Sequence, residues 1–340
     1  MNRRTKVLVT MPELEGKKDL LAAISKYSEV EYRICKTSDE TAAALKDVEI
    51  LYTQAVPSHL DHANRLKWVQ LHFSGIDHAS WSPIFDEQRG IIITNVAGAH
   101  AVPIAEYCVY IMGILGRDFL QLFRDQQTKT WSPRKYPVFE LCGQTLGIVG
   151  YGHVGGELGR MARALNMRVL ALKRNPQQRH ASGYQWKGVG DPEGIFPERF
   201  FGPADLPDLL KESDFVVNCL PHTKETRGLF AEREFNMMKP KRYFINVGRG
   251  ETVDYPALVR ALASGVIAGA ALDSHPTDPH PLPADSPIWE LPNVFISPHI
   301  SGTRHSLQYP ERTNELFCAN LRRYLDNQPL FNTVLKERGY

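Results

Sequence analysis

The sequence predicts an α/β protein of two lobes, each with a parallel sheet of the Rossmann or flavodoxin type, and a cleft between the lobes. Three observations predict this class: short apolar runs alternate with helical patterns, the alternation occurs in two successive series, and one longer helical pattern joins the series. A chain of 340 residues also exceeds the usual size of one domain. In such architecture we expect a ligand site at the carboxyl ends of the strands.

The first series runs from the N-terminus to about residue 101. Helical patterns at Lys18–Tyr27 and Ser38–Lys46 separate its early strands. Strand-like runs are expected at Val7–Thr10, Val30–Ile34, Ile50–Tyr52, Trp68–Leu71 and Ile91–Thr94. Near the other end of the chain, Gln308–Leu325 is helical again.

The second series follows the long helical pattern Val102–Arg117, where Pro103 suits the first turn. The polar stretch Arg124–Pro137 has no clear periodicity, and Asn175–Pro207 is rich in Gly and Pro, which predicts a long surface excursion. Strands are expected at Leu146–Val149, Arg168–Leu172, Phe215–Leu220, Tyr243–Val247, Gly269–Leu272 and Val294–Ser297.

Composition and charge argue against several classes of function. The chain is 43% hydrophobic and 23% charged with a net charge of +2, which gives no reason to expect a nucleic acid or a membrane surface as partner. No apolar run approaches the roughly 18 residues that span a bilayer, and no signal-peptide core follows the basic N-terminus. Five dispersed cysteines without a CxxC pair predict reduced thiols and no zinc site. We therefore expect a cytoplasmic protein without a metal.

The segment Leu146–Gly155 has the pattern of a strand followed by G-x-G-x-x-G. Side chains at the three glycine positions would keep a pyrophosphate from the backbone N–H groups. The apolar residues that follow recur at helical spacing, so the context is strand, loop and helix. The alternative is that the glycines only serve a tight turn. The residues expected to bind a dinucleotide here are Gly150, Gly152, His153, Val154 and Gly155. We call the segment Gly150–Gly155 the glycine loop.

The end of the next strand bears on the choice of dinucleotide. Arg168–Leu172 is followed by Lys173 and Arg174, and no carboxylate is present to favour the free 2′-hydroxyl of NAD. Two cations would attract a 2′-phosphate, so NADP(H) is favoured. NAD(H) stays possible if both side chains extend into solvent and the dinucleotide is held by backbone contacts.

Polar residues follow three later strands of the second series. Arg249 follows one strand, Asp273 and Asp278 the next, and His299 the last, all at the edge where open α/β sheets keep their sites. A guanidinium could anchor and polarise a keto acid, and an imidazole could supply the proton that its reduction needs. The alternatives are a structural histidine, a helix-end arginine and, for Asp278, a solvated turn residue.

Around these residues the sequence resembles the D-isomer-specific 2-hydroxyacid dehydrogenase family. The matching positions are Asn246, Arg249-Gly250, Val253-Asp254, Ala257-Leu258, Ser264-Gly265, Ala268–Asp273 and Pro298-His299. The front half matches more loosely, through Ser74–His78, Thr94–Val96 and Ala105-Glu106. The resemblance implies D-specific hydride transfer between NAD(P)H and a small 2-keto or 2-hydroxy acid, in a homodimer.

The resemblance also implies roles for individual residues. Arg249 would clamp the substrate carboxylate and polarise its carbonyl, and His299 would be the general acid in reduction and the base in oxidation. The family pairs this His with a Glu before a proline, whereas this chain has Asp278, one methylene shorter, so the backbone must approach more closely or the bond lengthens. The further cofactor contacts implied are Pro221, Thr226, Val247 and Asp273. The substrate contacts implied besides Arg249 are Ser74, Gly75 and His100.

The resemblance assigns residues 102–304 to a dinucleotide-binding domain. It assigns residues 1–101, completed by 305–340, to a substrate-binding domain. Two other functions stay open: a dehydrogenase of another small anion such as phosphite or formate, and a corepressor-like protein that senses nicotinamide nucleotides. The formate-oxidising relatives carry an amide where Asp278 stands, which disfavours formate here. The sequence leaves the identity of the 2-keto acid open.

Overall fold

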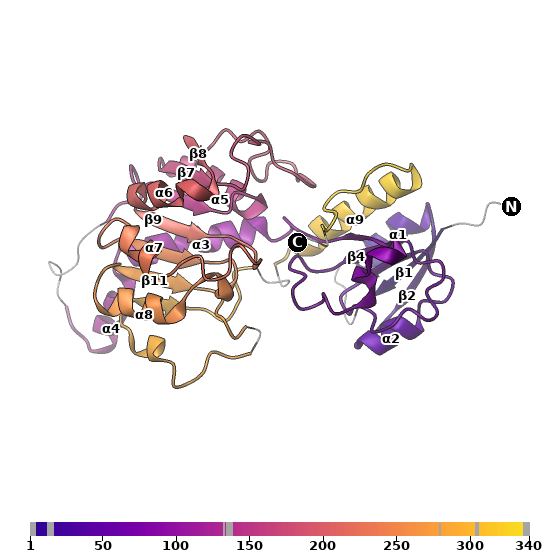
Figure 1. Ribbon diagram of the computed structural model, residues 1–340, viewed down its shortest axis with the longest axis horizontal. Helices are drawn as coiled ribbons and strands as arrows, with labels where there is room; N and C mark the ends of the chain where they lie inside the picture. Colours follow the sequence, from indigo (N-terminus) through magenta and orange to yellow (C-terminus); the bar gives the residue numbers. More distant parts are fainter. Residues whose placement is uncertain are drawn as a thin grey trace. The chain divides into compact units, whose positions relative to one another are not determined.

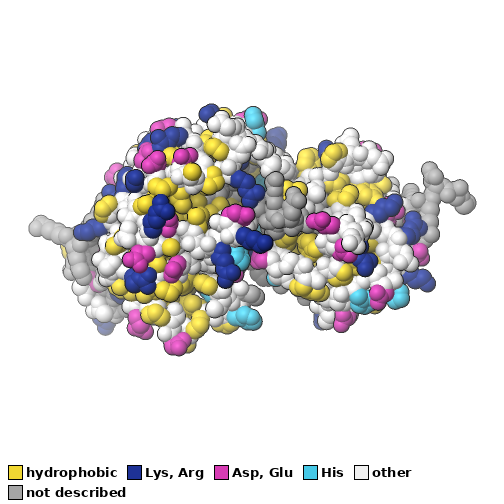
Figure 2. Space-filling view, in the orientation of Figure 1, with side chains coloured by type: hydrophobic (Ala, Val, Ile, Leu, Met, Phe, Trp, Pro, Cys, Tyr) yellow, Lys and Arg dark blue, Asp and Glu magenta, His cyan; other side chains and the backbone are white. Residues whose placement is uncertain are grey.

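The computed structural model describes residues 5–11, 17–131, 133, 139–278, 280–302 and 306–335. It divides into two compact units, the first comprising Met1–Ala99 with Arg304–Tyr340 and the second His100–Thr303 (Figure 1). Which ligand each unit binds stays a prediction. Figure 2 shows basic and acidic side chains interspersed over the visible face, in keeping with a net charge of +2. Within the described ranges, every helix is too short or too polar to cross a bilayer.

The first unit is built on a five-stranded parallel sheet with the order β2-β1-β3-β4-β5, which is the flavodoxin-like order. Its strands are β1 (Lys6–Thr10), β2 (Glu29–Arg33), β3 (Ile50–Thr53), β4 (Trp68–Leu71) and β5 (Ile92–Thr94). Its helices are α1 (Lys17–Ser25), α2 (Ser38–Ala43) and α9 (Tyr309–Leu325), with short 3₁₀ turns at Pro83–Phe85 and Glu87–Arg89.

Side chains of the first sheet alternate between two cores because successive strand residues point to opposite faces. In β1, Leu8 joins the core that contains Leu45 next to α2, whereas Val7 joins the core shared with α1 and α9. In the second of these cores Phe317 of α9 stacks on Tyr52 of β3, with ring centroids 4.7 Å apart. The helix near the C-terminus therefore completes the first unit.

The second unit contains a seven-stranded parallel sheet with the order β12-β11-β10-β9-β6-β7-β8. The strands are β6 (Thr145–Val149), β7 (Arg168–Leu172), β8 (Arg199–Phe201), β9 (Phe215–Asn218), β10 (Tyr243–Asn246), β11 (Gly269–Leu272) and β12 (Val294–Ile296). This is the Rossmann order with one additional strand, and the order reverses between β6 and β9. Dinucleotides bind at the carboxyl edge of such a reversal.

Helices cover both faces of the second sheet (Figure 1). One face packs on α3 (Ala101–Gly116) and α5 (His153–Ala164), and the other on α6 (Leu206–Glu212), α7 (Glu232–Met237) and α8 (Tyr255–Ala263). Neighbouring residues of β10 divide between the layers, Phe244 on the α6–α8 face and Ile245 on the α3–α5 face. The fold class expected from the sequence, two parallel-sheet α/β lobes, is confirmed.

Two local predictions were wrong. The stretch Asn175–Pro207 is not a simple surface excursion, because it contains strand β8 and a 3₁₀ turn at Pro203–Asp205, and it buries Trp186 and Asp191. The strand is three residues long between Gly- and Pro-rich neighbours, too short for a periodic signal. Helix α4 (Phe119–Gln127) was also missed, and it enters the stretch from Arg124 that was expected to be irregular.

Candidate active site

The three glycines of the glycine loop occupy three different environments. Gly150 has φ +104°, and a Cβ there would lie 3.0 Å from the carbonyl carbon of Cys219. A Cβ on Gly155 would lie 2.6 Å from the oxygen of Gly150, so helix α5 and the loop meet there. A Cβ on Gly152 would meet no atom within 4 Å, so its backbone faces open space. A tight turn, an open backbone and a close helix contact are what a pyrophosphate cradle needs. The residues present therefore fit a dinucleotide.

His153 and Val154 are the first residues of α5, where backbone N–H groups are free of intrahelical partners. The side chain of His153 is directed into the protein: its Nε2 lies 3.1 Å from the carbonyl oxygen of Tyr184 and, since a carbonyl only accepts, donates to it. Burial lowers the pKa of this imidazole. Any contact of His153 with a dinucleotide stays a prediction. Because its side chain points into the protein, such a contact would be made by its backbone N–H.

The two cations after β7 have different surroundings. The ammonium of Lys173 donates to the carbonyl oxygens of His180 at 3.0 Å and Arg179 at 3.4 Å, and burial lowers its pKa. Arg174 is exposed. A hydrogen bond with Thr223 is the main cause that lowers the pKa of Glu225, and the charge of Arg174 contributes to the same shift. Arg174 therefore lies near the loop that follows β9.

That loop contains Pro221 and Thr226, which the structure brings together. The hydroxyl of Thr226 donates to the carbonyl oxygen of Pro221 at 2.6 Å and accepts from the N–H of Thr223 at 2.8 Å. Val247, just after β10, donates its N–H to the oxygen of Asn218 at the end of β9. Pro221, Thr226 and Val247 therefore lie after β9 and β10, and β9 pairs with β6, whose carboxyl end carries the glycine loop.

Arg249, Asp278 and His299 come from loops after three adjacent strands, β10, β11 and β12. The loops are in direct contact: a Cβ on Gly250 would lie 1.9 Å from the carbonyl carbon of His275, and Ser274 Oγ donates to the oxygen of Gly248 at 3.3 Å. Only glycine fits after the arginine, because the backbone of the next loop occupies the side-chain position. Packing thus requires a glycine directly after Arg249.

The backbone carbonyl of Arg249 is held by residues before and after it in the sequence. Its carbonyl accepts from Thr252 Oγ1 at 2.6 Å and from Asn246 Nδ2 at 3.3 Å, and its guanidinium donates to the oxygen of Gly248 at 3.2 Å. The side chain is partly exposed. A planar guanidinium on a fixed backbone suits two-point binding of a carboxylate.

His299 pairs with Asp278 through a hydrogen bond between Nδ1 and Oδ2. An ionised carboxylate only accepts, so Nδ1 carries the proton and Nε2 is the nitrogen left for a substrate. The His299 side chain is 49% exposed and that of Asp278 is 20% exposed, so the pair is accessible from solvent on the imidazole side. The bond forms although Asp is shorter than Glu, which means that the backbone supplies the missing reach.

Asp273 anchors the loop that carries His299. It is 2% exposed, and its carboxylate accepts from Ser297 Oγ at 2.6 Å, from the N–H of Ile300 at 2.9 Å and from the N–H of Ser301 at 3.0 Å, as well as from the Ser301 hydroxyl. The loop is thus held on both sides of His299, which itself has φ +53°. The expected contact between Asp273 and the nicotinamide amide stays a prediction.

The sequence analysis missed the partners of Asp273. Ser297 and Ser301 flank His299 symmetrically, and Ser297 Oγ also lies 2.7 Å from the hydroxyl of Tyr107 on α3. Burial raises the pKa of Tyr107, so the phenol stays protonated. The Ser-x-His-x-Ser spacing was a usable signal for the serines, but no local pattern points to a tyrosine 190 positions earlier.

The remaining predicted substrate residues lie in both units. Ser74 and Gly75 follow β4 of the first unit, where Asn95 Nδ2 donates to the oxygen of Ser74 at 2.9 Å and holds the turn. His100 directly precedes α3 of the second unit, and a Cβ on Gly302 would lie 3.4 Å from its Cβ. His100 is therefore close to the loop of His299. Their roles stay predictions.

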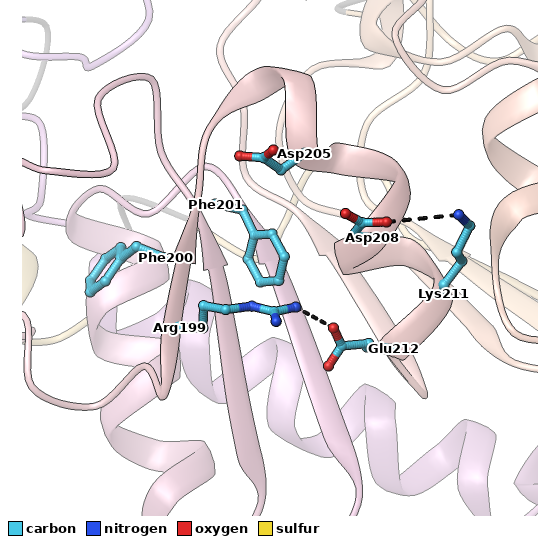
Figure 3. Close-up of a pocket in the computed structure, with 7 residues that line it drawn as sticks. All are labelled: Arg199, Phe200, Phe201, Asp205, Asp208, Lys211 and Glu212. Carbon is cyan, nitrogen blue, oxygen red and sulfur yellow. Dashed lines mark hydrogen bonds and ion pairs between the residues drawn. The ribbon is translucent and has the colours of Figure 1, made fainter.

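Other features of the described residues offer weaker sites. A surface pocket beside the edge strand β8 is lined by Arg199, Phe200, Phe201, Asp205, Asp208, Lys211 and Glu212 (Figure 3). Its charges are paired with each other, Arg199 with Glu212 and Lys211 with Asp208, and none of its residues was predicted to be functional. Within the same described ranges, His, Cys, Asp and Glu side chains do not gather in groups of three that could hold a metal ion.

Comparisons with known proteins agree on one family. The chain matches the NAD binding domain of D-isomer specific 2-hydroxyacid dehydrogenases over residues 109–301, more than half of its length. It is 31% identical over 305 residues to a D-3-phosphoglycerate dehydrogenase of Dictyostelium discoideum, covering 85% of this chain and 69% of the relative. It is 30% identical over 292 residues to a glyoxylate reductase of Thermococcus kodakarensis, covering 82% and 80%. A solved D-isomer specific 2-hydroxyacid dehydrogenase of Xanthobacter autotrophicus, in complex with NADPH and MES, aligns with a TM-score of 0.79 at 25% identity, covering 99% of this chain and 100% of that one.

Proposed function

The chain belongs to the D-isomer-specific 2-hydroxyacid dehydrogenase family, and on that premise we propose that Arg249, His299 and Asp278 carry its reaction, the reversible reduction of a small 2-keto acid to the D-2-hydroxy acid. The observation that supports the assignment most is the hydrogen bond between His299 and Asp278 on a loop packed next to that of Arg249. The Asp278 side chain is only 20% exposed, which argues against a fully solvated turn residue.

The side chains would divide the work as follows. When bound, the reduced nicotinamide supplies the hydride. The Arg249 guanidinium binds the substrate carboxylate and polarises the keto oxygen. The imidazolium of His299 gives its Nε2 proton to the oxygen that becomes the hydroxyl, while Nδ1 stays bonded to Asp278. In the reverse direction, neutral Nε2 takes the hydroxyl proton, and the Asp278 carboxylate stabilises the positive charge that develops on the ring.

We propose NADP(H) as the preferred dinucleotide, with NAD(H) as a weaker alternative. The second Rossmann strand β7 ends without a carboxylate, and the exposed Arg174 follows it near the loop after β9. A guanidinium there favours a 2′-phosphate, whereas the missing acid removes the usual preference for a free 2′-hydroxyl. The solved Xanthobacter relative in complex with NADPH supports the same preference.

The test is a panel of 2-keto acids, including glyoxylate, hydroxypyruvate, pyruvate and bulkier aryl and branched acids, each with NADPH and with NADH. We expect loss of absorbance of the reduced dinucleotide with at least one small acid, faster with NADPH, and a D product on chiral chromatography. His299→Ala should lower kcat by about 10²–10⁴ while NADPH still binds. Absence of turnover across the panel, or full turnover by the variant, contradicts the proposal.

We make two further proposals, a homodimer and a cytoplasmic location. Helices α3 and α4 carry exposed apolar residues, among them Tyr110, Phe119 and Phe123, which a second copy of the chain would cover. Light scattering should give twice the chain mass, and Phe119→Glu with Phe123→Glu should give a monomer.

All five cysteines are free thiols, as expected in a reducing compartment such as the cytoplasm. Fluorescent tagging with fractionation tests the location.

A further inference from the structure

The 175–198 segment, which lies between β7 and β8, is bound by side chains of the glycine loop and of α5. Tyr151, which stands between Gly150 and Gly152, donates its hydroxyl to Asp191 Oδ2 at 2.7 Å. Asp191 is 4% exposed and also accepts backbone N–H groups of the segment at 2.9 and 3.1 Å. A Cβ on Gly159 would lie 2.6 Å from the Tyr151 hydroxyl, so α5 leaves room for this phenol. Tyr151, the residue between the first two glycines of the loop, is therefore hydrogen-bonded to the segment.

The first two turns of α5 hold the segment at two more places. The fully buried Glu157 accepts the N–H of Gly190 at 2.6 Å, and Arg160 binds both oxygens of the same carboxylate at 2.6 and 2.9 Å. One turn earlier, His153 Nε2 donates to the oxygen of Tyr184. Both contacts are made to backbone atoms, so they constrain the path of the segment.

The end of β7 is tied to the beginning of the segment by Lys173. Its ammonium donates to two carbonyl oxygens, those of Arg179 and His180. An ammonium has three N–H donors, so two of them hold backbone here. A lysine engaged in this way positions the chain where the adenosine end of a dinucleotide is expected.

Glycine-rich loops lose more conformational freedom on becoming ordered than other segments do. A loop that is already held needs less ordering when a ligand arrives, and this strengthens binding without any added ligand contact. We propose that the 175–198 segment is part of the dinucleotide site: it holds the glycine loop in its binding conformation through Tyr151, and Lys173 positions the segment instead of binding the 2′-phosphate. The inference rests on the proposed dinucleotide-dependent function.

The two roles of Lys173 predict different binding data. A positioning residue supports the pyrophosphate and adenosine that NADPH and NADH share, so its loss weakens both. If Lys173 instead bound the 2′-phosphate, its loss would weaken the binding of NADPH alone. The experiment is fluorescence titration of the full chain with each reduced dinucleotide, using Tyr151→Phe, Lys173→Met and, as matched control, Glu193→Gln. Glu193 belongs to the same segment, but within the described residues its side chain pairs only with His180, and both side chains are exposed.

We expect Tyr151→Phe and Lys173→Met to raise the Kd of both dinucleotides about tenfold, with the ratio of the two affinities unchanged, and Glu193→Gln to bind like the wild type. Weakening of NADPH alone by Lys173→Met, or unaltered binding by Tyr151→Phe, overturns the inference. Circular dichroism establishes that each variant is folded, and the partly exposed Lys173 keeps the test valid should Tyr151→Phe not fold.

Limited trypsin digestion gives a second readout on the segment itself, since Arg179 and Lys187 are exposed cleavage sites within it. Both substitutions should speed cleavage at these sites, and NADPH should slow cleavage of the wild type. Equal cleavage rates in the wild type and the two variants would contradict the inference. A wild-type chain that binds neither dinucleotide would instead overturn the proposed function, and this inference with it.

Discussion

Asp273 accepts both hydrogen bonds that Ser301 can donate, one from its backbone N–H at 3.0 Å and one from its hydroxyl. Since the same carboxylate also holds Ser297 and the N–H of Ile300, one buried acid determines the course of the chain on either side of His299. His299, the proposed proton donor, is therefore positioned by a residue that follows the neighbouring strand β11.

Asp273→Asn should lower kcat on the order of a hundredfold, because its amide group would face N–H donors and release the His299 loop. Steady-state kinetics with a fixed 2-keto acid measures this. Tyr107→Phe removes only a hydroxyl that contacts Ser297 and does not touch Asp273 itself, and should lower kcat less. Equal kcat in Asp273→Asn and the wild type would show that the loop does not depend on this carboxylate.

Asp278→Asn should lower kcat by about 10² or more, since an amide can present its N–H to the imidazole and favour the wrong tautomer. Asp278→Glu keeps the charge and should retain more activity than the amide variant, although the added methylene must be accommodated. The comparison of kcat between the two variants is decisive. Activity in Asp278→Asn at or above that of Asp278→Glu would remove the charge from the mechanism.

Gly250→Ala should destabilise the second unit by about 1–3 kcal/mol and lower turnover, because the new Cβ would overlap the backbone of His275. The matched control is Gly113→Ala in helix α3, where a Cβ meets no atom within 4 Å. That substitution should stabilise the protein by about 0.5–1 kcal/mol. Urea unfolding followed by circular dichroism measures both. A neutral Gly250→Ala would mean that the two loops separate readily.

The stability of the protein should depend on pH through His153. Burial lowers the pKa of His153 in the folded state below its usual value of about 6.5, so the unfolded chain takes up the proton first as the pH falls. The contribution of the neutral ring is complete above pH of about 6.5 and is lost as the pH falls toward the folded pKa. The loss of Tm between pH 7.5 and 5.5, to be measured by calorimetry, should be smaller in His153→Gln. Equal losses would contradict this linkage.

Much of the fold could be predicted because its signals are local. The strands at Val7–Thr10 and Arg168–Leu172 and the helix after Val102 are given by the spacing of apolar residues, which reflects one or two buried faces. Strand β8 escaped this reasoning because it is three residues long, and its place is decided by pairing with β7. The Gly- and Pro-rich composition of Asn175–Pro207 predicted an exposed segment. Hydrogen bonds from side chains of the glycine loop and α5, which are distant in sequence, bury part of it.

By itself, the sequence determined the two α/β series, the glycine loop after β6, and the Arg, Asp and His that follow three consecutive strand ends. These features depend on residue type and short spacing, which the chain carries locally. Only the tertiary structure decided that Asp273 holds the His299 loop, that Gly250 must lack a side chain, and that Tyr151 binds Asp191. Each of these contacts joins residues distant in sequence, and whether they meet depends on the packing of whole layers, which no local pattern records.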